Sequence, residues 1–250
     1  MHATCLKHSI EYPVRVYKIG GQIPVRLGTC PECDTEKAAA EARQGARRLE
    51  RIVRRSRVGP MYHDAELEGF KTHTPGLEQA RDAVAELIET KKGKVVLLGR
   101  NGTGKTHLAS VAVLKLAGQI WTMSEISARI RASYMSNANE SEYRILQTLS
   151  DISMLAIDEI GRTRKSEHDT DWLGRIIDKR HTWFRPLILI SNKHARSSCR
   201  RKGCADCFEN YLDDGSVSRL AEGTKVIYIE AKDFRLGYRQ YVGEGLRYVS

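Results

Sequence analysis

Short apolar runs alternate with helical apolar spacing from about residue 75 to residue 229. A short apolar run predicts a buried strand, and apolar residues that recur every three or four positions predict an amphipathic helix. The expected strands are 94–98, 119–123, 154–157, 186–190 and 225–229, and the expected helices are 75–90, 107–116, 124–134, 142–150, 169–184 and 208–212. Strands that alternate with helices indicate an α/β domain.

The first 60 residues do not follow this alternation. Residues 14–27, with Gly20-Gly21 in the middle, predict a β-hairpin. Residues 34–57 are rich in Ala, Arg and Glu and predict one exposed helix, which Gly59-Pro60 would end. We therefore expect a small module over residues 1–58 and an α/β domain over residues 59–250.

The composition bears on the expected binding partner and on the expected cellular compartment. The formal net charge is +10, and residues 1–60 hold 12 Lys and Arg against 6 Asp and Glu. This excess raises the expectation of a polyanionic partner. The basic helix itself fits three interpretations: a solvated linker, a partner-docking helix or a contact with a phosphate backbone. No run approaches about 18 apolar residues, and no signal peptide opens the chain, so we expect a cytoplasmic protein.

The octapeptide from Gly99 to Thr106 fits the pattern G-x-x-x-x-G-K-[ST] and lies between an expected strand and an expected helix. Gly102 and Gly104 permit backbone angles that let successive amides surround phosphate oxygens. Lys105 would reach the β- and γ-phosphates, and the hydroxyl of Thr106 would ligate magnesium. The alternative is a Gly-rich turn ahead of a helix, and the strand–loop–helix setting favours a nucleoside triphosphate site.

A second chemical signal follows the strand expected over residues 154–157, which ends in Asp158-Glu159. Asp158 would hold the hydrated magnesium, and Glu159 would polarise the attacking water. After the strand at 186–190, Asn192 is a candidate to hold that water or to sense the γ-phosphate. Taken alone, the acid pair fits a solvated loop and the Asn fits the start of a turn.

Six cysteines in a cytoplasmic chain favour metal binding or reduced thiols over disulfides. Cys5-x2-His8 and Cys30-x2-Cys33 are two pairs whose spacing suits one tetrahedral ion, which predicts a zinc-ribbon-like structural site. Coincidence, with free thiols and an exposed His8, is the alternative.

A second cysteine group lies in a stretch rich in Arg and Lys. Cys199, Cys204 and Cys207 follow His194 with looser spacing. Free thiols in a basic loop and a second zinc knuckle fit this pattern equally well.

Taken together, these motifs resemble the AAA+ ATPases, specifically the DnaC-like replicative helicase loaders of phage and prophage type, which are related to IstB. Residues 102–109 resemble the phosphate loop and helix start of that family, and residues 155–161 resemble its Walker B motif. Ser191-Asn192 resembles its sensor 1, and Arg219 falls where the family places its arginine finger. The resemblance spans about residues 62–239.

The resemblance implies a P-loop NTPase with a central parallel five-stranded sheet of order 5-1-4-3-2 and no C-terminal lid domain. It implies ATP and Mg²⁺ bound between head-to-tail subunits, with Arg219 of one subunit reaching the γ-phosphate that Lys105 of the next one holds. Lys105, Glu159, Asn192 and Arg219 would be catalytic. The residues expected to bind the nucleotide and its magnesium are Gly99, Asn101, Gly102, Thr103, Gly104, Lys105, Thr106, His107 and Asp158.

The implied function is that of a replicative helicase loader. Residues 5–57 would dock a DnaB-type helicase, and single-stranded DNA would lie on residues 124–142 and on a loop with Arg162, Arg164 and Lys165. A transposition helper of the IstB type, acting on double-stranded DNA, is the alternative. A small-molecule kinase with the same phosphate loop fails to explain Glu159, Asn192 and Arg219 together. The resemblance places the protein in the cytoplasm of a bacterial or phage-infected cell.

Overall fold

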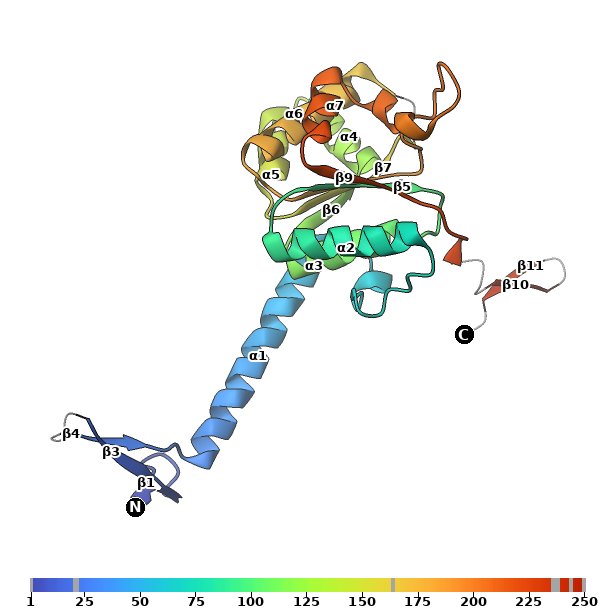
Figure 1. The fold of residues 1–250 in the computed structure, drawn as a ribbon. Coiled ribbons are helices and arrows are strands. Elements are labelled where there is room, and N and C mark those ends of the chain that lie inside the picture. Colours follow the sequence, from blue (N-terminus) through green and yellow to red (C-terminus); the bar gives the residue numbers. More distant parts are fainter. Residues whose placement is uncertain (1, 20–22, 163–164, 235–238, 243–244, 249–250) are drawn as a thin grey trace. The chain divides into compact units, whose positions relative to one another are not determined.

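The computed structural model describes residues 2–19, 23–162, 165–234, 239–242 and 245–248 (Figure 1). The chain divides into two compact units, Met1–Arg51 and Ile52–Ser250. The division falls inside the long helix α1 (Pro31–Ser56), whereas the expected division at residue 58 follows that helix.

The first unit is built from short hairpins and the start of α1. Strand β1 (His2–Thr4) pairs with β2 (Glu11–Pro13), and β3 (Arg15–Ile19) pairs with β4 (Ile23–Leu27), both antiparallel. The second pair confirms the predicted hairpin, and its Gly20-Gly21 turn lies outside the described residues. Helix α1 begins at Pro31 rather than at residue 34, because proline at the first helical position loses no hydrogen bond.

The second unit is organised around a parallel sheet of order β6-β7-β8-β5-β9. Its strands are β5 (Lys94–Gly99), β6 (Gln119–Thr122), β7 (Leu155–Ile160), β8 (Leu187–Ser191) and β9 (Thr224–Ile229). Numbered along the chain, this order is 5-1-4-3-2, which confirms the expected architecture.

Helices cover both faces of this sheet, as Figure 1 shows, and the strands alternate between two cores. Val95 and Leu97 of β5 face the core under α2 (Pro75–Thr90) and α3 (Lys105–Lys115). Val96 and Leu98 face the opposite core. The helices over that core are α4 (Met123–Ala132), α5 (Glu142–Asp151), α6 (Glu167–Thr182) and α7 (Asp214–Ala221). The strands β5 and β8 are buried on both faces, which is why they are continuous apolar runs, whereas the edge strand β9 exposes Val226 and Tyr228.

Three local features differ from the sequence prediction. Residues 208–212 contain only a 3-10 turn, η3 (Phe208–Tyr211), and helix α7 forms just after it without having been predicted. The side chain of Asp213 caps α7 by accepting from the amide of Ser216, at 2.9 Å. Strand β7 continues through Asp158-Glu159 instead of ending before them.

The remaining elements are short. Two further 3-10 turns, η1 (Pro60–Tyr62) and η2 (Arg196–Ser198), lie in connections, and β10 (Arg239–Val242) pairs antiparallel with β11 (Gly245–Tyr248). Among the described residues after β9 there is no α-helix. None of the described helices combines the length and the apolar character needed to cross a lipid bilayer.

Candidate functional site

Three neighbouring strands bring the predicted nucleotide motifs to one edge of the sheet. Strand β8 lies between β5 and β7, with Leu98 opposite Ser191 and Ile160 opposite the same serine. The loop after β5, the acids of β7 and the residue after β8 therefore meet at the carboxyl ends of the strands. Ligands of open α/β sheets bind at that edge.

The phosphate loop has the backbone that its glycines predict. Gly99, Gly102 and Gly104 have φ angles of 135°, 71° and 87°. At Gly99 a Cβ would also collide with the carbonyl oxygen of Ile229 in the neighbouring strand, so only glycine fits there. The loop thus has the left-handed glycine conformations of a phosphate-binding turn ahead of the N-terminus of α3.

Lys105 begins α3 and is 5% exposed. Its Nζ donates to the carbonyl oxygens of Gly99 and Arg100, at 2.7 and 2.6 Å. The buried Thr103 accepts from the same Nζ at 3.3 Å and donates to Arg100 at 3.0 Å. These bonds hold the ammonium group inside the curve of the loop, where it can meet an anion.

The two predicted magnesium ligands are in direct contact. Thr106 Oγ1 donates to Asp158 Oδ2 at 2.7 Å, and Asp158 Oδ1 accepts from the amide of Glu159 at 2.6 Å. A hydroxyl and a carboxylate oxygen at this separation suit Mg²⁺, which prefers oxygen ligands. The donor set therefore fits the ion.

Glu159 lies on an irregularity of β7. The register with β8 shifts between Ile157 and Ile160, and Glu159 has a φ of 61°. A non-glycine residue with positive φ in a strand is strained, and such strain is concentrated at functional sites. At this bulge the Glu159 carboxylate pairs with Arg162, and Glu159 lines the same cavity as Asn192.

Asn192 follows β8 and contacts the phosphate loop directly. Its Nδ2 donates to Asn101 Oδ1 at 2.6 Å. Both asparagines line an open groove of about 910 Å³ together with Arg100, His73 and Phe234.

Sequence reasoning missed the aromatic walls of this groove. The rings of His73 and Phe234 lie 5.0 Å apart, and the amide of Phe234 donates to Gly102 O at 3.0 Å. These two rings come from segments before β5 and after β9, and nothing in their local sequence indicates the meeting. Elsewhere, on α3, the ring of His107, an expected nucleotide-binding residue, lies 5.5 Å from that of Phe70.

Arg219 is not among the residues that meet at the loop. It lies on α7, its side chain is 37% exposed, and its Nε pairs with Asp178 of α6 at 2.5 Å. The described ion pair of this arginine is thus with a helix of the same chain, and the guanidinium remains partly accessible from outside.

In the first unit, the predicted zinc donors converge. His8 Nδ1 lies 3.6 Å from Cys5 Sγ, 3.6 Å from Cys30 Sγ and 3.4 Å from Cys33 Sγ. The hydrogen bond from the backbone of His8 lowers the pKa of the Cys5 thiol to about 6, which favours the metal-binding thiolate. For tetrahedral zinc with usual bond lengths, nitrogen and sulfur ligands lie about 3.5 Å apart, so the donor set fits the ion.

The second group is also assembled. The donor atoms of His194, Cys199, Cys204 and Cys207 all lie within 4.8 Å of one another. All six cysteines of the chain are free.

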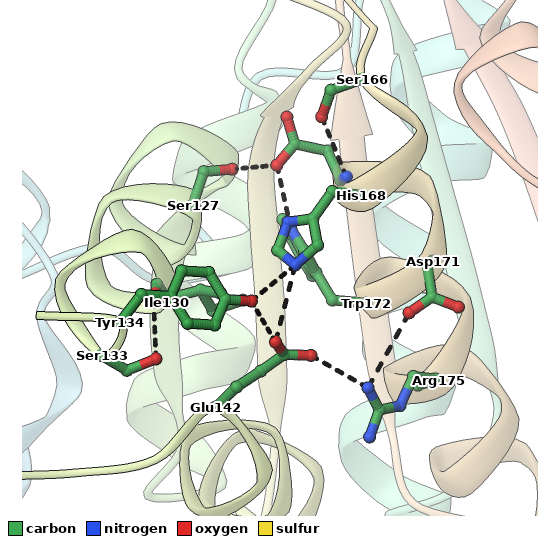
Figure 2. A network of polar contacts seen from close by, with 11 residues as sticks. Ser127, Ile130, Ser133, Tyr134, Glu142, Ser166, His168, Asp171, Trp172 and Arg175 are labelled. Atoms are coloured by element: carbon green, nitrogen blue, oxygen red, sulfur yellow. Dashed lines mark hydrogen bonds and ion pairs between the residues drawn. The ribbon is translucent and has the colours of Figure 1, made fainter.

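A polar network fixes part of the predicted DNA-facing surface. Figure 2 shows the hydroxyl of Tyr134 between Glu142 and His168, with His168 Nε2 at 2.8 Å. Arg175 of α6 pairs with Glu142 at 2.9 Å. Tyr134 follows α4 and contacts residues of α5 and α6, yet it is 59% exposed. Of the basic loop, Arg164 lies outside the described residues, and Arg162 and Lys165 are exposed.

Most arginines of α1 are exposed to solvent. Arg57, one residue beyond that helix, has a structural role instead: its guanidinium lies 3.6 Å from the Trp121 ring centre and pairs with Glu125 at 2.7 Å. The arginines within α1 therefore face solvent, whereas Arg57 packs against the α/β unit.

Comparisons with known proteins agree with this geometry. A family model described as IstB-like ATP binding protein matches residues 34–239. Replicative helicase loader DnaC of Escherichia coli (strain K12) is 27% identical over 174 residues, which are 66% of this chain and 71% of that protein. The protein of the same name from Buchnera aphidicola subsp. Schizaphis graminum (strain Sg) is 27% identical over 205 residues, 79% of this chain and 78% of the relative.

Solved structures share the fold. The crystal structure of the DnaC helicase loader superposes with a TM-score of 0.56 at 20% identity and covers 69% of this chain and 100% of that chain. The replication initiator DnaA bound to AMPPCP and single-stranded DNA gives a TM-score of 0.54 at 21% identity, over 70% of this chain and 51% of that chain.

Proposed function

The chain belongs to the family of IstB-like ATP-binding proteins, and we propose that it is an ATP-dependent loader of a DnaB-type replicative helicase in DNA replication initiation. The observation that carries the proposal is the loader name shared by relatives that match about two thirds or more of the chain. The assembled loop, acid pair and asparagine support an ATPase that works as a switch.

In this proposal the loop from Gly99 to Thr106 binds the triphosphate. Its amides, including those at the N-terminus of α3, would donate hydrogen bonds to the phosphate oxygens, and Lys105 would exchange its carbonyl contacts for the β- and γ-phosphates. Thr106 and Asp158 would hold Mg²⁺, which neutralises charge on those phosphates when bound.

Hydrolysis needs a positioned water. Glu159, whose backbone is strained, would accept a proton from that water. Asn192 would orient the water or sense the γ-phosphate, because its amide already touches Asn101 of the phosphate loop. These roles assign the chemistry to residues from three adjacent strands.

The proposed active state is an oligomer. Arg219 is partly exposed on α7, which suits a role at the site of a neighbouring subunit. A head-to-tail contact of this kind builds a ring or an open spiral.

The first unit would be the docking module. Zinc held by Cys5, His8, Cys30 and Cys33 would be structural, because four protein ligands leave no open position. The exposed arginines of α1 and the ring of Tyr134 are candidate contacts for phosphates and for single-stranded DNA bases, respectively.

The family description itself favours a second candidate, an IstB-like transposition helper that acts on double-stranded DNA. The two functions share the ATPase site and differ in partner.

Co-purification with a replicative helicase distinguishes the helicase loader from the transposition helper. We expect the full chain, incubated with ATP, to elute with a bacterial replicative helicase hexamer and to transfer it onto single-stranded DNA. The Lys105→Ala variant should retain the fold and lose nucleotide-dependent loading. Failure to bind the helicase, together with ATP-dependent binding of double-stranded DNA, would overturn the loader in favour of the transposition helper.

A further inference from the structure

Four metal-binding side chains converge just beyond the tip of β8, in the α/β unit. His194 Nε2 lies 3.5 Å from Cys204 Sγ and 3.5 Å from Cys207 Sγ. With Cys199 included, all four donor atoms lie within 4.8 Å of one another. The three thiols are free, so no disulfide accounts for their approach.

These distances suit one tetrahedral ion. Zinc bonds of ordinary length place nitrogen and sulfur ligands about 3.5 Å apart and two sulfurs about 3.8 Å apart. Three thiols and one imidazole select zinc over the hard cations that oxygen ligands bind. We propose that His194, Cys199, Cys204 and Cys207 bind a structural zinc ion that braces the wall of the ATP site next to Asn192 and Glu159.

Two of the ligands are anchored in the domain. Cys207 is 3% exposed, and the amide of Phe208, a core residue, donates to His194 O at 2.9 Å. A parallel bridge joins His194 to Cys207. These contacts fix one side of the donor set before any ion is bound.

The other two ligands come from an exposed basic segment. Arg200, Arg201 and Lys202 lie between Cys199 and Cys204. Like charges on adjacent residues oppose a compact loop, whereas a zinc ion with three thiolates carries net negative charge and attracts them. The ion would therefore close a segment whose own side chains repel one another.

The same segment forms part of the proposed catalytic site. A cavity of about 420 Å³ lies at the sheet edge, and its lining includes Glu159, Arg162, Asn192, Lys193, His194 and Asp206. Lys193 Nζ donates to Asp206 at 2.6 Å and so ties the residue after Asn192 to the residue before Cys207. Loss of the ion would release the wall that faces Glu159. This coupling to turnover rests on the proposed ATPase function, whereas the metal site itself does not.

Zinc content of the purified full chain tests the site. We expect about two equivalents of zinc in the parent and about one in the Cys30→Ser/Cys33→Ser variant, which removes only the first site. Cys204→Ser should also keep about one, and the triple variant should keep none. Absence of zinc from Cys30→Ser/Cys33→Ser overturns the second site, even where Cys204→Ser fails to fold.

Turnover tests the bracing role. We expect Cys204→Ser to lower ATP turnover about tenfold or more with little change in nucleotide affinity, because small displacements of positioning groups slow chemistry. Cys204→His, which retains a ligand atom, should restore both zinc and turnover. Zinc loss with unchanged turnover overturns the bracing role. A parent without ATPase activity overturns the proposed function instead and leaves the zinc measurement to decide the site.

Discussion

Glu159 illustrates what one residue contributes to this site. Its backbone is in the left-handed region, it lies at the register shift of β7, and it lines the same cavity as Asn192. Straightening the strand would return the side chain to the face of the sheet, because residues of a regular strand alternate between faces. The strained backbone is thus what allows a carboxylate of this strand to line the cavity next to Asn192.

We expect Glu159→Gln to bind ATP nearly as tightly as the parent and to hydrolyse it at least about a hundredfold more slowly, because the amide cannot accept a proton. Steady-state turnover and a nucleotide titration measure the two effects. Glu89→Gln, an exposed change on α2, is the control. Turnover of Glu159→Gln at the parental rate would remove this residue from the mechanism.

The local sequence pattern did not predict the environment of Arg180. It is 0% exposed, and burial lowers the pKa of its guanidinium to about 9. Its NH1 donates to the carbonyl oxygens of Ser150 and Ile152, at 3.1 and 2.9 Å. An arginine in an amphipathic helix is usually on the solvent face, but here it satisfies backbone carbonyls at the end of α5.

At the scale of elements, hydrogen bonds between side chains of α4, α5 and α6 fix the surface that carries Tyr134. Ser127 of α4 and Trp172 of α6 both bond to one acid of α6, Asp169. Ser127 donates to Asp169 Oδ1 at 2.6 Å and Trp172 at 3.0 Å. Burial raises the pKa of this carboxyl, but the hydrogen bonds from Ser127, Trp172 and Ser166 and the charge of Arg131 together outweigh burial, so that the net pKa is lowered.

A lowered folded-state pKa means that the ionised acid stabilises the fold above its unfolded pKa, near 4, and that this stability is lost as pH falls through the folded value. We expect Asp169→Asn to reduce the free energy of unfolding by about 1 kcal/mol at pH 7, a modest value because the group is partly solvated. Urea titrations at several pH values should show this difference shrinking as the solution approaches pH 3.

The control lies on the same helix. Asp171 is 66% exposed in its side chain and faces Arg175 at 3.8 Å. Asp171→Asn should change stability little at any pH. An equal, pH-independent loss in both variants would contradict the role of the Asp169 hydrogen bonds.

For the whole molecule, the proposal places one ATP site between two subunits. Lys105 and Glu159 belong to one sheet edge, whereas Arg219 lies on α7 and pairs with Asp178 of α6. If Arg219 serves the neighbouring subunit, a mixed oligomer can combine an intact lysine from one variant with an intact arginine from the other.

We expect Lys105→Ala and Arg219→Ala each to be nearly inactive as ATPases, and their equal mixture to recover up to about a quarter of parental activity, because random mixing restores that share of interfaces. Mixing Lys105→Ala with Glu159→Gln is the control: both residues come from the same subunit, so no interface is restored. No recovery in the first mixture would contradict the shared site.

Much of the fold was predictable because it depends on near neighbours in the chain. The five strands and α2 and α3 follow from apolar spacing and caps, and the resemblance supplied the sheet order that the structure confirms. Helix α7 was missed because eight residues with Gly and Ser give weak helical spacing. The 3-10 turn at Phe208 was mistaken for a helix since both place apolar residues at similar intervals.

The phosphate loop, the acid pair at the end of an apolar run and the family could be predicted from the sequence alone, because those signals are local runs of residue types. Which of these residues touch depends on the folded structure. The contact of Asn101 with Asn192, the wall made by Phe234 and the gathering of His194 with three thiols depend on strand order and on where each chain segment crosses the sheet edge. Residues separated by 91 positions, as the two asparagines are, carry no local signal of their meeting.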